Sequence, residues 1–234
     1  MMRKTLWIGG VALAVAALVA PAAWTEEAAP VVDYAKVARM AAEAACPDNV
    51  DPVDIKGEAW TFDFKCDPIE PIVVLTPGGE KEVYWYIVYT VTNRSDKEHE
   101  FIPSFLLFSD TGKTTMAGMY PTVFKAITER RKIRFLESSL KMFGKVLPGE
   151  DNARTGVAIF GPIDRATDAF AVFVGGLSGQ YIERPKKGAK ADAPADEKVV
   201  RLHKTLAIKY KLPGDKWWKN QDPPVLVSKT WTWR

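Results

Sequence analysis

One stretch of alternating side chains limits the folds that are open to this chain. The residues EVYWYIVYTVTN, 82–93, are rich in the β-branched and aromatic types that favour strands. Side chains two apart in a strand share a face, so Val83, Trp85 and Ile87 form one apolar face. Tyr84 and Tyr86 lie on the opposite face, which is too apolar to be left in open solvent. Both faces of this strand are therefore expected to be used.

Further short β-type segments recur along the chain and are separated by turn signals such as TPGGE, NRSDKE and PGEDN. These segments are WTFDFKC, PIVVL, FIPSFLLF, TGVAIF, DAFAVFVGGLSG, VRLHKTLAIKYKL and VLVSKTWTWR. Several short strands at this spacing predict a mainly β fold, an antiparallel β-sandwich over residues 60–234. Residues 183–198, ERPKKGAKADAPADEK, have no aromatic side chain and predict a mobile loop within that domain.

Two segments have helical rather than β periodicity. Residues 33–46 read DYAKVARMAAEAAC, with Asp33 as a good N-cap, and predict an N-terminal helix within the linker 24–59. Pro121 suits the first turn of a second, inserted helix, in which Val123 and Ile127 lie on one face. This second helix is expected to cover the Tyr84 and Tyr86 face of the long strand. The alternative is that this face is a recognition surface.

The N-terminus has the pattern of an export signal. Arg3 and Lys4 precede an uncharged apolar run over residues 6–20, and small residues follow up to position 23. This order predicts a signal peptide over residues 1–23 and a periplasmic or extracellular protein. The alternative is an uncleaved membrane anchor over residues 6–24, because about 20 apolar residues suffice to span a bilayer.

The charge balance bears on nucleic acid as a partner, and the cysteine count bears on disulfide formation. Without Arg3 and Lys4 the chain has 30 basic and 29 acidic residues, a balance that gives no electrostatic footprint for nucleic acid. Cys46 and Cys66 are the only cysteines, and an even, sparse count in an exported protein predicts a disulfide. The alternative is two unrelated buried thiols.

The segment SDTGKTT contains two fragments of catalytic motifs. The triplet DTG carries the catalytic carboxylate of aspartic proteases, but those enzymes need two such carboxylates, and this chain has one triplet. A phosphate-binding loop would need glycine at position 107, where Leu107 stands. Asp110 and Gly112 are also ordinary turn residues, so the segment is interpreted as a hairpin between two strands.

No catalytic set emerges from the remaining residues. The only histidines, His99 and His203, do not adjoin a plausible nucleophile, so no hydrolytic triad is proposed. We therefore predict a protein that is not an enzyme, with no metal site and no cofactor.

Aromatic side chains give the best candidates for binding. Adjacent Trp217 and Trp218, in DKWWKNQ, cannot both point into a core from an extended segment. They form the first candidate binding surface, with a loop that caps the end of the domain as the alternative. Tyr84 and Tyr86 form the second candidate, if the helix leaves them accessible.

The segments YWYIVYTVTNRS, FLLFSDTGK, GKVLPGEDNARTGVAIF and FAVFVGGLSG occur in this order. Together they resemble an uncharacterised group of exported bacterial proteins, across residues 60–179. The resemblance implies an immunoglobulin-like sandwich and an exported location, and it brings no catalytic residue or ligand with it.

These observations favour a non-catalytic exported module of the cell envelope, with a binding or structural role and an envelope protein as its expected partner. A membrane-anchored subunit of an envelope assembly is one alternative, and a metal-dependent enzyme is another. The ligand and the biological process are not encoded in any motif of the sequence.

Overall fold

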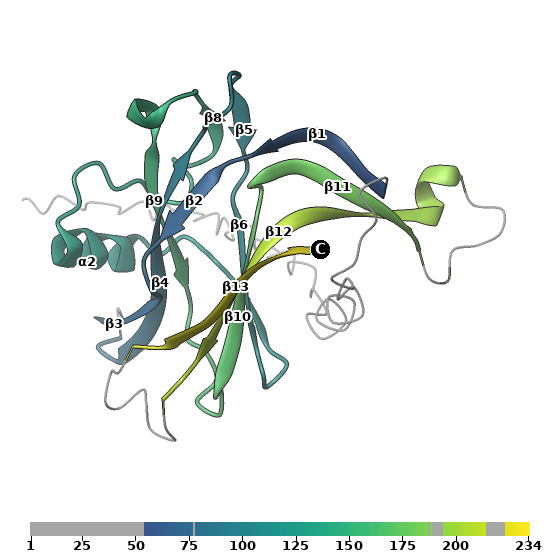
Figure 1. Ribbon diagram of the computed structural model, residues 1–234. Coiled ribbons are helices and arrows are strands. Elements are labelled where there is room, and N and C mark those ends of the chain that lie inside the picture. Colours follow the sequence, from purple (N-terminus) through teal and green to yellow (C-terminus); the bar gives the residue numbers. More distant parts are fainter. Residues whose placement is uncertain (1–53, 77, 187, 189–193, 214–222) are drawn as a thin grey trace, which may run out of the picture. The chain divides into compact units, whose positions relative to one another are not determined.

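The computed structural model describes residues 54–76, 78–186, 188, 194–213 and 223–234 (Figure 1). The signal peptide or anchor, residues 1–23, and the helix expected from Asp33 lie outside the described residues. The described part of the chain contains no helix that is long and apolar enough to cross a membrane.

Strand β4 (Lys81–Thr92) is the centre of a four-stranded antiparallel sheet. Strand β9 (Arg154–Phe160) lies along one edge of β4. The two halves of its other edge pair with β2 (Asp63–Cys66) and β3 (Glu70–Leu75). The predicted alternation is confirmed, because Trp85 and Ile87 belong to one buried cluster and Tyr86 belongs to another.

A larger, seven-stranded antiparallel sheet is built around β12 (Val199–Lys211). One edge of β12 pairs with β10 (Ala169–Gly175) and β11 (Ser178–Pro185), and the other edge pairs with β13 (Val225–Trp233). The remaining strands of this sheet are β1 (Ile55–Thr61), β6 (Ser104–Ser109) and β7 (Thr114–Met116). Strands β5 (His99–Phe101) and β8 (Gly144–Val146) form a separate pair.

The two sheets enclose one apolar core. The ring of Tyr89 on β4 lies 4.7 Å from that of Phe105 on β6, measured between centroids. The ring of Trp85 lies 6.1 Å from that of Phe170 on β10. Burial of each large apolar side chain contributes about 1.5–3 kcal/mol, so contacts of this kind hold the sheets together.

The predicted strand WTFDFKC is in fact two strands that belong to different sheets. Strand β1 pairs with β11 of the large sheet, and β2 pairs with β4 of the small sheet. Phe62 lies between them, and its N–H donates to the carbonyl of Leu177 at 2.8 Å. The side-chain alternation continues through this crossover, which is why the sequence pattern did not reveal it.

Helix α2 (Pro121–Arg131) covers the other face of the small sheet, as predicted. Val123 and Ile127 are buried against a cluster that includes Tyr86 and Val88 of β4. Figure 1 shows α2 on the side of β4 and β9 that faces away from β10 and β12. The helix ends where Lys132 takes a left-handed conformation, with φ of 51°, and donates its N–H to the carbonyl of Thr128.

The SDTGKTT segment is the hairpin between β6 and β7, as predicted. Gly112 has φ of 79°, a value that favours glycine. The Asp110 carboxylate accepts hydrogen bonds from the N–H groups of Asp168 and Ala169, at 3.0 and 2.9 Å. Asp110 therefore fixes a turn. A short 3-10 helix, η2 (Glu150–Asn152), forms at the predicted PGEDN turn.

The predicted loop 183–198 begins later than expected. Strand β11 continues to Pro185, and a 3-10 helix, η3 (Ala195–Lys198), leads into β12. Glu183 is held in the strand by ion pairs with Lys56 of β1, at 2.5 Å, and Arg201 of β12, at 3.2 Å. These two cross-strand partners make the charged residue compatible with a strand.

Candidate binding site at the start of helix α2

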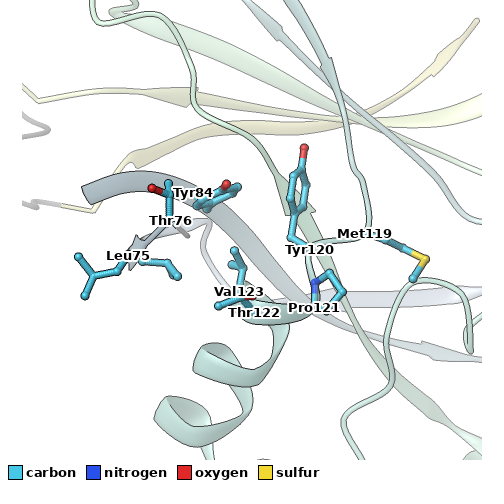
Figure 2. Close-up of a pocket in the computed structure, with 9 residues that line it drawn as sticks. Leu75, Thr76, Tyr84, Met119, Tyr120, Pro121, Thr122 and Val123 are labelled. Atoms are coloured by element: carbon cyan, nitrogen blue, oxygen red, sulfur yellow. The ribbon is translucent and has the colours of Figure 1, made fainter. Parts of the chain in front are cut away.

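A pocket of about 170 Å³ lies where the end of β3 and the start of β4 meet the first turn of α2 (Figure 2). Its described lining combines aliphatic, aromatic and hydroxyl side chains, and none of these described residues is a His, Cys, Asp or Glu. The lining residues are Val74, Leu75, Thr76, Tyr84, Met119, Tyr120, Pro121, Thr122 and Val123.

Two tyrosine rings lie against each other in the wall of this pocket. Tyr84 comes from β4 and Tyr120 directly precedes the helix; their ring centroids lie 5.0 Å apart with the planes at 61°. This edge-to-face arrangement is favourable for aromatic pairs. Both side chains are only partly buried, so the pair is held in place and remains accessible.

The position of Tyr120 follows from the residues around it. Pro121 sets the first turn of α2, and Tyr120 precedes it as the N-cap without a side-chain capping hydrogen bond. A Cβ atom at Gly118 or Gly161 would lie 3.1 Å from an atom of the Tyr120 side chain. The two glycines thus make room for the ring.

The hydroxyl of Tyr84 is oriented by a neighbouring carboxylate. It donates a hydrogen bond to Oε2 of Glu82 at 2.8 Å. This bond raises the pKa of Tyr84 above its ordinary value. The pocket therefore offers a partner two rings and neutral hydroxyl groups, which suits binding of an apolar or aromatic group.

Tyr86, which the sequence offered as part of a candidate binding surface, is buried in the structure. Tyr86 is 1% exposed and lies in the cluster beneath α2, so it cannot contact a partner directly. Its hydroxyl donates to Oε2 of Glu70 at 2.6 Å, and Nη1 of Arg131 donates to Oε1 of the same carboxylate at 2.9 Å. Burial, followed by this hydrogen bond, raises the pKa of Tyr86. Tyr86 thereby helps to fasten the C-terminal end of α2 to the sheet.

A second cavity, of about 520 Å³, is also lined by residues of the β3–β4 hairpin. Its walls carry charges of both signs around an aromatic residue. The lining residues are Val73, Glu80, Lys81, Glu82, Val83, Trp85, Pro162, Ile163 and Arg165.

The remaining predicted site residues are only partly described. Cys66 is half-buried and forms no disulfide within the described part of the chain, and burial raises the pKa of its thiol. Its predicted partner Cys46 lies outside the described residues, as do Trp217 and Trp218. The disulfide and the tryptophan surface therefore stay predictions.

Within the described ranges, no group of three or more His, Cys, Asp or Glu side chains is placed to hold a metal ion. One of the two histidines, His99, instead stacks on Trp60 with ring centroids 4.3 Å apart.

No protein-family model, curated protein or solved structure matches this chain. The functional interpretation therefore depends on the chemistry of the site.

Sequence reasoning identified Tyr84 but missed Tyr120. A tyrosine directly before the proline that opens a helix is a usable signal, because that position places the ring at the helix entrance. Its contact with Tyr84, 36 residues earlier in the sequence, depends on how the helix docks.

Proposed function

We propose that the protein is a non-catalytic exported module of the cell envelope, with an immunoglobulin-like antiparallel β-sandwich fold. Its proposed role is to bind an envelope protein through the pocket of Tyr84 and Tyr120. The observation that carries this proposal is the pair of partly exposed tyrosine rings over an apolar pocket. Tyrosine is enriched among the residues that dominate protein–protein binding.

The volume of the pocket indicates what it receives. Sites for whole small molecules usually enclose about 300–1,000 Å³, and this pocket encloses about 170 Å³. It is therefore suited to one apolar or aromatic side chain of a protein partner. Thr76 and Thr122 line the same pocket and supply hydroxyl groups for the adjoining backbone.

The exported location rests on the N-terminal pattern of Arg3, Lys4 and the apolar run that follows. If residues 6–24 are retained, the same binding role would belong to a membrane-anchored subunit. Trp217 and Trp218 remain a second proposed contact.

Site-specific photo-crosslinking in exporting cells tests the proposal. A photoreactive phenylalanine at position 84 or 120 is expected to give the same discrete protein adduct. Position 181 is the matched control, because Tyr181 is a partly buried tyrosine on β11 of the other sheet. Adducts that are absent at both 84 and 120, or equally strong at 181, would contradict the proposal.

A further inference from the structure

Residues 132–147, KIRFLESSLKMFGKVL, form a surface segment that the pocket does not explain. Four apolar side chains in it are strongly exposed: Phe135 at 77%, Leu140 at 59%, and Phe143 and Leu147 at 49% each. Exposed apolar side chains gathered in one part of the surface are typical of interaction sites.

The segment is firmly attached to the fold, so this exposure does not come from a lack of anchoring. Glu137 pairs with Arg154 of β9 at 2.6 Å, and its N–H donates to the carbonyl of Thr155 at 2.9 Å. Met142 is fully buried in the core, and its carbonyl accepts a bond from Arg154. The polar and buried residues hold the segment to β9, while Phe135, Leu140 and Phe143 point outward.

Phe135 is held outward at an energetic cost. Its φ of 63° is in the left-handed region, which is unfavourable for an aromatic residue. The guanidinium carbon of Arg134 lies 4.7 Å from the centre of its ring. An exposed aromatic side chain in a strained conformation beside a cation is consistent with a functional contact.

The charge of the segment identifies the kind of partner. It contains four basic residues and one acidic residue; Glu137 is paired with Arg154, and Lys145 is paired with Glu98. Lys132, Arg134 and Lys141 are exposed and have no acidic partner within the described part of the chain. Unpaired basic side chains interleaved with Phe and Leu suit an anionic lipid surface, because the cations can contact lipid phosphates while the apolar side chains enter the headgroup region.

We propose that residues 132–147 dock onto an anionic lipid surface. In this arrangement Phe135, Leu140 and Phe143 enter the headgroup region, and Lys132, Arg134 and Lys141 contact lipid phosphates. This proposal goes beyond the proposed function and does not depend on the tyrosine pocket.

Hydrogen–deuterium exchange of the full chain with lipid vesicles tests the proposal. The method reports protection segment by segment, so membrane binding by the N-terminal segment is distinguished from binding by residues 132–147. Amides in 132–147 are expected to gain protection with vesicles that contain phosphatidylglycerol, but not with phosphatidylcholine alone. The protection should disappear in about 1 M salt, where the screening length falls to about 3 Å.

Matched variants sharpen the test. Arg134→Glu with Lys141→Glu should weaken apparent vesicle binding by about 30-fold or more, at about 1 kcal/mol for each lost basic contact. Lys209→Glu with Lys211→Glu, which reverses two exposed lysines of β12, should leave the protection unchanged.

A second pair of variants tests the apolar contact. Phe135→Asn with Phe143→Ser should also lose protection, and Asn suits the positive φ at position 135, so folding should persist. Leu226→Ser, at a residue that is 54% exposed on β13, is the control.

The proposal would be overturned if residues 132–147 gained no protection, or if both vesicle types protected them equally. It would also be overturned if the test and control variants had equal effects. Protection that requires a protein partner instead of lipid would overturn it as well. Crosslinking at position 84 should be unaffected by these variants, so the two proposals can fail separately.

Discussion

At the scale of single residues, a position can require glycine for two reasons: a positive φ, or too little space for a Cβ atom. Two glycines of this chain separate these reasons. Gly176 and Gly79 both have φ of 81°. A Cβ at Gly176 would lie 2.1 Å from the carbonyl oxygen of Ile102, whereas a Cβ at Gly79 would have no atom within 4 Å. Gly79 therefore carries only the conformational demand, and Gly176 carries both.

Alanine substitutions at these two glycines should therefore destabilise the fold to different extents. Gly79→Ala should lower the free energy of unfolding by about 1–2 kcal/mol through the positive φ alone. Gly176→Ala should lower it by at least about 2 kcal/mol more, because the new methyl group meets backbone that cannot move aside cheaply. Urea denaturation of both variants measures the difference, and equal losses would show that the close approach to Ile102 has no energetic role.

At the scale of elements, the sequence predicted what local periodicity controls. The two-residue period of β4 correctly placed Trp85 in one core and Tyr86 in the other, and Pro121 correctly marked the start of α2. The crossover at Phe62 was missed, because the side-chain alternation continues through it and the strands that pair on either side lie far away in the sequence.

The same distinction between local pattern and long-range packing applies to the candidate site. The sequence predicted the aromatic face of β4 and the helix that covers it. It could not predict how far along β4 the helix covers this face. Tyr86 is buried beneath α2, whereas Tyr84, two residues earlier, remains partly exposed. That boundary is set by the docking position of α2.

At the scale of the whole molecule, the account predicts a covalent connection between the two ends of the 46–66 segment. A Cys46–Cys66 disulfide would close a loop of about 20 residues and stabilise the folded state by roughly 3 kcal/mol. In protein isolated from its native compartment, mass spectrometry without reduction should find no alkylatable thiol. Two alkylatable thiols would contradict the prediction.

The central claim, the proposal that the protein recognises its partner through the tyrosine pocket, is tested most directly by calorimetric titration. The titrant is the protein captured at positions 84 and 120, and Tyr84→Leu is the test variant because it keeps apolar packing beside α2. The expected result is that this variant binds about 30-fold more weakly, a loss of about 2 kcal/mol, with only the small drop in Tm that follows from losing the ring contact with Tyr120. The account also predicts unchanged affinity for Tyr181→Leu. Equal affinities of the wild type and Tyr84→Leu would contradict the account.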